Sequence, residues 1–169
     1  AANIIKEKLG GSVAGKSFLI LCGKGNNGGD GAALARILWT KGAKVQVFLF
    51  GKVEETNGDA RINLEFCQKT YEIEKVKENV RFWFFEYFDR DWVNEVTSMF
   101  RSCMYSNTIV IDAFFGTGLL RELDGQLKEL AKRYAKLKSE DKIFFLISLD
   151  IPSGLNADIS EPIGENIKA

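Results

Sequence analysis

Three stretches of this sequence gather glycine and polar side chains of the kinds that bind phosphate groups or metal ions. They read GKGNNGGDG at 23–31, DAFFGTGLLRELDG at 112–125 and DIPSGLNAD at 150–158. Glycine lets backbone amides approach a ligand closely, and asparagine, aspartate and serine supply oxygen atoms as acceptors or ligands. We therefore expect the chemistry of this protein to lie in these three segments.

The first stretch favours an anion-binding turn. Asn26 and Asn27 tolerate left-handed backbone, and the two glycines after them adopt it freely, so successive amides can curl into a nest around an anion. The two carboxamides add hydrogen-bond donors and acceptors. The alternative is a plain glycine-rich turn in which Asp30 caps the following helix.

The second stretch also has features of a phosphate site. Gly116, Thr117 and Gly118 can bring backbone amides close to a phosphate group, and Arg121 can add a positive charge with a fork of donors. The alternatives are that Asp112 only forms an Asx turn and that Arg121 is only a solvated side chain.

The third stretch starts with Asp150 at the end of an apolar run, and Pro152 stiffens the turn that follows. Ser153 exposes a hydroxyl and an amide there, although Asp150 alone is also compatible with a turn-capping role. Two strand-end aspartates with an asparagine and a serine nearby offer oxygen ligands to a hard cation. A group 1 or group 2 ion fits such a set better than zinc does.

Alternating strands and helices are expected to position these segments. Apolar runs predict strands, and patterns with helical spacing or helix-start signals predict helices between them. The expected strands are 17–22, 44–50, 107–115 and 142–152, and the expected helices are 28–42, 57–70 and 125–140. A short strand at 71–76, an edge segment within the aromatic run 80–93 and a helix at about 89–101 are weaker predictions.

Continuous apolar strands that alternate with helices favour an α/β fold whose mainly parallel central sheet is covered on both faces. Ligands in such sheets bind beyond the carboxyl ends of the strands, so the three polar stretches should meet at one edge. The segment GKVEETNGD at 51–59 follows the second strand and is expected to join the same rim.

Two short motifs match familiar nucleotide-binding patterns without the context that those patterns need. GGSVAGKS at 10–17 fits the Walker A letters, but it precedes a strand, whereas a phosphate loop must open a helix. Gly23, Gly25 and Gly28 form a G-x-G-x-x-G that does open a helix. No acidic residue ends the next strand to bind a ribose, and Asp30 would repel a pyrophosphate, which disfavours a standard NAD site.

Composition limits the remaining classes. The 23 basic and 23 acidic residues balance, so there is no electrostatic signature for nucleic acid or an anionic membrane. The sequence has no histidine, which excludes a Ser-His-Asp triad and most zinc sites. No run has the length of a membrane span, and no signal peptide is recognised. Cys22, Cys67 and Cys103 are expected to be buried free thiols in a reducing, cytoplasmic setting.

The motifs GKGNNGGDG, IVIDAFFGTGLLRELDG and LDIPSGLNAD resemble, in this order, the signature segments of the YjeF N-terminal domain family, and NGDARINLEFCQK at 57–69 is similar to its next helix. The family contains the NAD(P)H-hydrate epimerases and apolipoprotein A-I-binding protein. The resemblance runs from about residue 3 to residue 158 and implies a Rossmann-like, three-layer α/β/α fold. Residues 1–169 are accordingly expected to form one domain that is trimmed at both ends, and the aromatic segment 80–93 has no family counterpart.

The resemblance also implies site residues. A potassium ion would be held by Asn27, Asp112 and Ser153. The implied substrate-binding residues are Asn26, Asn27, Gly28, Gly29, Asp30, Gly116, Thr117, Gly118, Leu119, Leu120, Arg121, Glu122 and Asp150.

Epimerisation of hydrated NADH and NADPH is the activity that the resemblance implies. Asp150 is the expected catalytic residue, since a carboxylate can shuttle a proton and partial burial would raise its pKa toward the working range. A homodimer and a fused or separate dehydratase that acts on the S form are the expected partners. One alternative is a non-catalytic scaffold, because decapping-enhancer proteins resemble this family and use the domain for dimerisation and RNA-associated binding. The other is a generic NAD- or ATP-binding enzyme.

Overall fold

The computed structural model describes residues 1–88, 91–117, 122–139, 145–155, 164 and 166–167. The described part forms a five-stranded sheet in which every neighbouring pair is parallel, in the order β3-β2-β1-β4-β5. The strands are β1 (Ser17–Cys22), β2 (Lys44–Phe50), β3 (Phe82–Tyr87), β4 (Ile109–Ala113) and β5 (Leu146–Ser148). The helices are α1 (Ala2–Lys8), α2 (Asn26–Thr40), the 3-10 turn η1 (Val53–Glu55), α3 (Gly58–Glu74), α4 (Val93–Ser106) and α5 (Gly125–Ser139).

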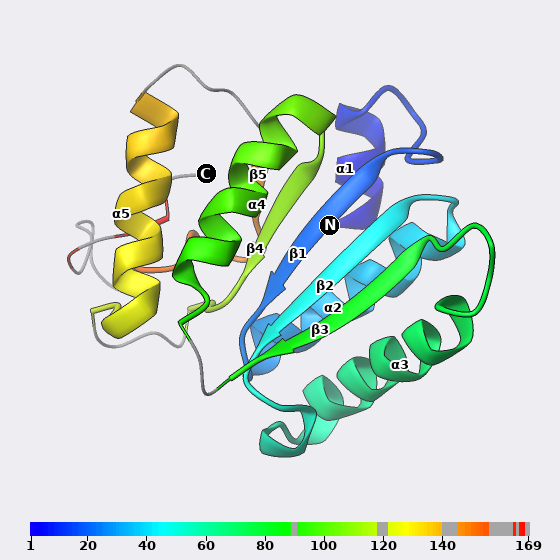
Figure 1. Ribbon diagram of the computed structural model, residues 1–169, viewed down its shortest axis with the longest axis horizontal. Helices are drawn as coiled ribbons and strands as arrows, with labels where there is room; N and C mark the ends of the chain where they lie inside the picture. The colour runs from blue at the N-terminus through cyan, green and yellow to red at the C-terminus, as the bar shows by residue number, and fades with distance from the viewer. Residues whose placement is uncertain (89–90, 118–121, 140–144, 156–163, 165, 168–169) are drawn as a thin grey trace.

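Helices cover both faces of this sheet (Figure 1). On β1, Phe18, Ile20 and Cys22 belong to the core under α1, α2 and α3. The alternate residues Leu19 and Leu21 belong to a second core under α4 and α5. Because both faces of the strand are buried, its sequence is apolar at successive positions. The predicted three-layer α/β/α arrangement with a parallel sheet is confirmed.

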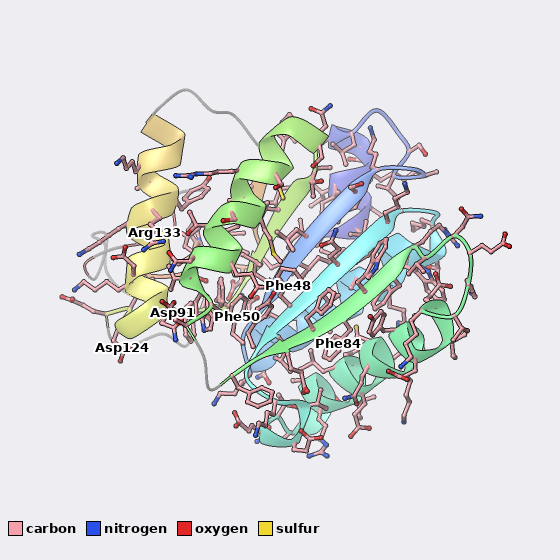
Figure 2. The ribbon with its side chains drawn as sticks, viewed as in Figure 1. Phe48, Phe50, Phe84, Asp91, Asp124 and Arg133 are labelled. Carbon is pink, nitrogen blue, oxygen red and sulfur yellow. The ribbon has the colours of Figure 1, made fainter. Side chains whose placement is uncertain are left out.

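The aromatic segment 80–93, which has no counterpart in the family that the sequence resembles, contributes to both cores. Phe82 and Phe84 on the edge strand β3 pack in the core on the α3 side, whereas Tyr87 and Trp92 pack in the core on the α4 side. Figure 2 shows Phe84 toward α3 and Phe48 toward α4. The expected edge strand within 80–93 is therefore confirmed.

Several predicted boundaries are wrong. The expected strand at 71–76 does not form, because α3 continues to Glu74 and packs Tyr71 against the core. Helix α4 begins at Val93 rather than near residue 89 and ends where Asn107 adopts left-handed backbone (φ 51°). Within the expected strand 142–152, β5 is only Leu146–Ser148, and residues 142–144 lie outside the described part.

Three smaller expectations are settled by position and burial. The Walker-like segment 10–17 lies between α1 and β1 and opens no helix, so its rejection as a phosphate loop is confirmed. The three cysteines are free and buried, as expected. Burial raises the pKa of Cys67 to about 12 and that of Cys103 to about 11, so both stay protonated at neutral pH. Among the described helices, none is long and apolar enough to cross a membrane.

Glu74, the last residue of α3, fixes the turn that leads into β3. Its buried carboxylate accepts a hydrogen bond from the Arg81 amide at 3.0 Å and pairs with Lys77. Burial by itself would raise the pKa of this carboxyl, but the hydrogen bonds from Lys77 and Arg81 outweigh burial and hold the pKa below its ordinary value.

We expect Glu74→Gln to lower the free energy of unfolding by about 2 kcal/mol at neutral pH, because hydrogen bonds to a charged group are lost. Since the folded-state pKa lies below the unfolded-state value, this stabilisation is present above about pH 4.5 and is lost as the pH falls through the folded pKa. Urea unfolding at about pH 7 and about pH 3 measures both effects. Glu72→Gln, in an exposed pair with Lys75, is the matched control and should change stability by about 0.5 kcal/mol or less. Equal losses in the two variants would contradict the role of Glu74.

Candidate active site

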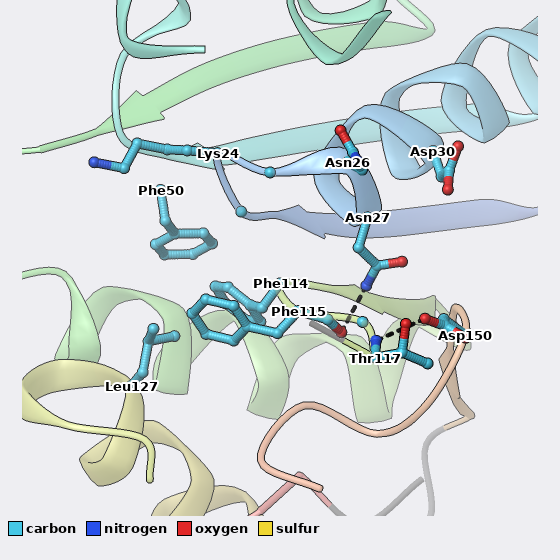
Figure 3. Close-up of a pocket in the computed structure, with 13 residues that line it drawn as sticks. Lys24, Asn26, Asn27, Asp30, Phe50, Phe114, Phe115, Thr117, Leu127 and Asp150 are labelled. Atoms are coloured by element: carbon cyan, nitrogen blue, oxygen red, sulfur yellow. Dashed lines mark hydrogen bonds between the residues drawn. The ribbon is translucent and has the colours of Figure 1, made fainter. Parts of the chain in front are cut away.

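A pocket of about 780 Å³ opens beyond the carboxyl ends of β1, β2 and β4 (Figure 3). Its polar wall is made by residues from the α2 start and from the loops after β4 and β5, namely Asn26, Asn27, Asp30, Thr117 and Asp150. Its apolar wall comprises Phe50, Phe114, Phe115 and Leu127. The expectation that the three polar stretches meet at one edge of the sheet is therefore confirmed.

Helix α2 begins earlier than expected, and this changes the account of the first stretch. Gly25 is the N-cap, and Asn26 to Asp30 occupy the first helical turns instead of a loop. None of the glycines from Gly23 to Gly31 has a positive φ, so the expected left-handed nest is wrong. The helix start still points unpaired backbone amides at the pocket, which favours an anion there. Asp30 is exposed and does not cap the helix.

The glycines of this stretch are required for close packing. A Cβ on Gly28 would lie 1.8 Å from the carbonyl oxygen of Gly23, and one on Gly29 would lie 2.5 Å from the Cα of Ala60. A Cβ on Gly31 would lie 2.7 Å from that of Ala113 on β4. Helix α2 can therefore lie against β1, β4 and α3 only because these positions have no side chain.

Asp112 lies inside β4, is fully buried, and joins the second and third stretches. Its Oδ1 accepts a hydrogen bond from the Ser153 hydroxyl at 2.7 Å, and its Oδ2 accepts bonds from the Ser153 amide and the Ser148 hydroxyl, both at 2.9 Å. The Phe114 amide donates to Oδ1 at 3.3 Å. Burial raises the pKa of this carboxyl against the opposing effect of the hydrogen bonds. All four donors are neutral groups. They stabilise a negative charge on Asp112 by hydrogen bonding, but they bring no positive charge to cancel it.

The backbone of Phe115 links all three stretches. Its carbonyl oxygen accepts a hydrogen bond from the Asn27 side-chain amide at 2.8 Å, and its amide donates to the Ser153 hydroxyl at 3.0 Å. The three residues expected to bind a cation, Asn27, Asp112 and Ser153, are thus brought together around the backbone of Phe114 and Phe115. The side chains of Asn27 and Ser153 and the carbonyl group of Phe115 supply hard oxygen atoms beside the buried carboxylate of Asp112.

Asp150 presents its carboxylate to the pocket from a strained backbone. Its φ of 67° lies in the left-handed region, which aspartate tolerates better than most residues. Its Oδ2 accepts a hydrogen bond from the Thr117 amide at 2.8 Å, and a Cβ on Gly116 would lie 2.5 Å from the same oxygen. Asp150 lies two residues beyond β5 and is exposed, so the expected partial burial is wrong.

Several residues of the expected substrate-binding set are not among the described lining residues of the main pocket. Gly28 is buried beneath the start of α2, and Gly29 borders a side pocket. Glu122 pairs with Lys128 at 3.2 Å and does not belong to the described lining of the main pocket. Residues Gly118, Leu119, Leu120 and Arg121 lie outside the described part of the chain.

A model of the YjeF-related protein N-terminus family matches residues 1–169. This chain belongs to that family. As a YjeF-related domain it is 34% identical over 165 residues to the bifunctional NAD(P)H-hydrate repair enzyme Nnr of Moorella thermoacetica, covering 98% of this chain and 28% of the relative. It is 31% identical over 154 residues to the NAD(P)H-hydrate epimerase of Oenococcus oeni, covering 91% of this chain and 60% of the relative. The chain therefore spans less than two thirds of these relatives.

The YjeF-related domain is also similar to a solved structure, the crystal structure of yeast ynu0 (YNL200c). The TM-score is 0.67 at 22% identity, and the match covers 96% of this chain and 62% of the yeast chain. At this level of identity the likeness shows the fold.

Sequence reasoning missed the apolar wall of the pocket in this YjeF-related domain and the lysine in its described lining. Phe50 ends β2, and Phe114 and Phe115 follow β4, so their apolar character had suggested only core positions. Lys24 also lines the pocket, and its Nζ pairs with Glu55 at 2.9 Å. The one available signal was position, since all except Leu127 lie at the end of a strand or within two residues after it.

A side pocket of about 240 Å³ adjoins the main one and shares Asn26 and Asp30 with it. Its other wall is the start of α3, with Asp59 and Asn63. Together with the Lys24–Glu55 pair, this confirms that the segment 51–59 joins the rim. Within the described ranges, no three Cys, Asp or Glu side chains cluster as a polyvalent metal would require.

Proposed function

We propose that this chain is an NAD(P)H-hydrate epimerase domain, which interconverts the R and S forms of hydrated NADH and NADPH. The observation that carries the proposal is the placement of the Asp150 carboxylate, hydrogen-bonded to the Thr117 amide, in the wall of the pocket where the three polar stretches meet. The names of the relatives, NAD(P)H-hydrate epimerase and bifunctional NAD(P)H-hydrate repair enzyme, support the same reaction.

The chemistry of the substrate explains why a carboxyl group is needed. The stereocentre is the ring carbon that carries the added hydroxyl, so inversion must break and remake the carbon–oxygen bond. In the proposed step, the Asp150 carboxyl gives a proton to the departing hydroxyl, which leaves as water while the ring nitrogen stabilises the cationic carbon. Water then adds to the opposite face and returns a proton to the carboxylate, so atoms and charge balance. The amide of Thr117 holds the carboxyl in place.

We also propose a resident potassium ion held by Asn27, Asp112 and Ser153. The donor set fits, since carboxylate, hydroxyl and amide oxygens are hard ligands, and the buried Asp112 carboxylate is surrounded by neutral donors. A bound monovalent cation would offset that buried charge and hold the three stretches together. The residues that contact the substrate would thereby keep their positions.

We expect potassium to stabilise the wild-type protein against heat, since a cation that binds only the folded state raises its melting temperature. At 100 times its dissociation constant the gain is about 2.7 kcal/mol. Melting temperatures in potassium chloride and in choline chloride of equal ionic strength measure it. In Asp112→Asn the difference between the two salts should vanish. A variant that keeps the wild-type potassium response would remove Asp112 from the cation site.

The alternatives make different predictions about binding. A non-catalytic scaffold does not require the carboxylate, asparagine and serine groups that meet at this pocket, and their assembly favours the enzyme. A generic nucleotide-binding enzyme would bind unmodified NAD or ATP tightly, which calorimetry would detect. Three expectations stay predictions: the homodimer, the dehydratase partner and the cytoplasmic location. Light scattering on the purified chain would measure whether it forms a homodimer.

The proposed function is tested by incubating the purified chain with the pure R form of hydrated NADH, with and without potassium, and by following the S form by chromatography. Conversion to the equilibrium mixture faster than in a protein-free control is the expected result. If the folded protein in potassium converts the R form no faster than the protein-free control does, the proposal is refuted.

A further inference from the structure

The pocket has two chemically different ends. In Figure 3, Thr117 and Asp150 lie on one side, and Phe50 and Leu127 lie on the other, beside the rings of Phe114 and Phe115. The first end offers a carboxylate and amides. The second offers ring faces and a leucine side chain, which have no use in moving a proton.

At the aromatic end, neighbouring rings hold the Phe50 ring in place. The Phe50 ring lies 4.3 Å from the Trp92 ring and 4.6 Å from the Phe114 ring, measured between centroids, and stacks on Tyr87 at 5.5 Å with an interplanar angle of 18°. Because neighbouring rings fix its orientation, Phe50 can contact a flat ligand with little loss of side-chain entropy. Leu127, from α5, supplies apolar surface on the same side.

The two halves of the proposed substrate differ in the same way. Hydration saturates a double bond of the nicotinamide ring, so that ring is puckered and carries a hydroxyl and a carboxamide. Adenine is flat and aromatic, with two apolar faces that stack on aromatic side chains. The volume of about 780 Å³ lies in the range of pockets that enclose whole ligands of this kind, so both ends can be occupied at once.

Resting on the proposed function, we infer that the Phe50–Leu127 end binds the adenine base of the substrate while the hydrated ring lies at Asp150. The start of α2, with Gly25, Asn26 and Asn27, lines the pocket between these two ends, where its backbone amides can face the phosphate groups that join the two halves. Phe50 is thus a binding residue remote from the reaction, and its loss acts on substrate affinity.

Calorimetric titration of the wild-type chain with two separate halves, AMP and nicotinamide mononucleotide, tests this assignment. Phe50→Leu should weaken AMP binding by about tenfold, since stacking contributes about 1–3 kcal/mol per base. Its affinity for nicotinamide mononucleotide should stay within about twofold of the wild-type value. Phe66→Leu, which removes a partly exposed ring on α3 that is absent from the described lining of both pockets, is the matched control and should alter neither affinity.

A second variant covers the case in which Phe50→Leu does not fold. Leu127→Ala removes apolar surface from the same end and should weaken AMP binding by about threefold or more, on the scale of a few buried methyl groups. The inference is overturned if the wild-type chain does not bind AMP, if folded variants at both positions bind it as well as the wild type, or if they lose nicotinamide mononucleotide instead. Failure of the proposed function is distinguishable, since AMP would then bind as expected while the R form is not converted.

Discussion

Asp150→Asn should lower the rate constant of epimerisation by about 10² to 10⁴, the contribution of a positioned acid–base group. The asparagine is nearly the same size, and its side-chain oxygen can still accept the hydrogen bond from the Thr117 amide, so the pocket wall should keep its shape. It cannot give up and recover a proton at that oxygen. We therefore expect kcat to collapse while KM stays within about threefold, as for loss of an interaction made only during the reaction.

Two further carboxylates make this experiment specific. Asp30, like Asp150, lines the main pocket, and Asp59 lies beside it at the start of α3. Asp59→Asn is the control and should leave kcat within about twofold of the wild-type value. Loss of kcat in Asp30→Asn with normal turnover in Asp150→Asn would transfer the proton-shuttle role to Asp30. Normal turnover in all three variants would show that none of these carboxylates moves the proton.

The fold was predictable because its sequence signals are local. Continuous apolar runs such as Ser17–Cys22 are the consequence of burial on both faces, and each is bounded by polar or glycine residues. The errors lie where a tertiary contact decides. The alternating residues 71–76 had the period of a strand, but packing of Tyr71 on the core and the ion pair of Glu74 extend α3 to Glu74.

The polar half of the site was predictable for a related reason. Asn27, Asp112 and Ser153 each lie at or just beyond the carboxyl end of a strand, and a parallel sheet brings such ends to one edge. The apolar half was not, since a phenylalanine that lines a pocket and one that fills a core have the same sequence signature. Phe50 is at once in contact with the core and part of the pocket wall.

The glycines of the first stretch were assigned the wrong physical reason. Sequence alone shows that a position lacks a side chain, and it does not tell whether the backbone needs a positive φ or a neighbour needs the space. Here the space decides, since Gly28 is helical and faces a backbone carbonyl. This distinction has a consequence for stability, because a backbone atom cannot move aside as a flexible side chain can.

Gly28→Ala should therefore damage both the fold and the site. The added Cβ would lie 1.8 Å from the carbonyl oxygen of Gly23 and 2.7 Å from its carbonyl carbon, so helix α2 must shift away from the end of β1. Overpacking of this kind costs about 3 kcal/mol. Because α2 carries Asn27, whose amide holds the Phe115 carbonyl at 2.8 Å, the same shift should separate the first stretch from the other two. We expect a large loss of unfolding free energy in urea and loss of AMP binding in the folded fraction.

Gly25→Ala is the matched control, since Gly25 lies three residues away in the same stretch and a Cβ there would meet nothing within 4 Å. Gly25 is the helix N-cap, where alanine is less favourable than glycine by about 1 kcal/mol or less, so a small loss is expected. If glycine served here only to start the helix or to keep the turn flexible, the N-cap substitution would be the more damaging of the two. A larger loss in Gly25→Ala than in Gly28→Ala would thus contradict the close-packing explanation and favour the alternative of a plain glycine-rich turn.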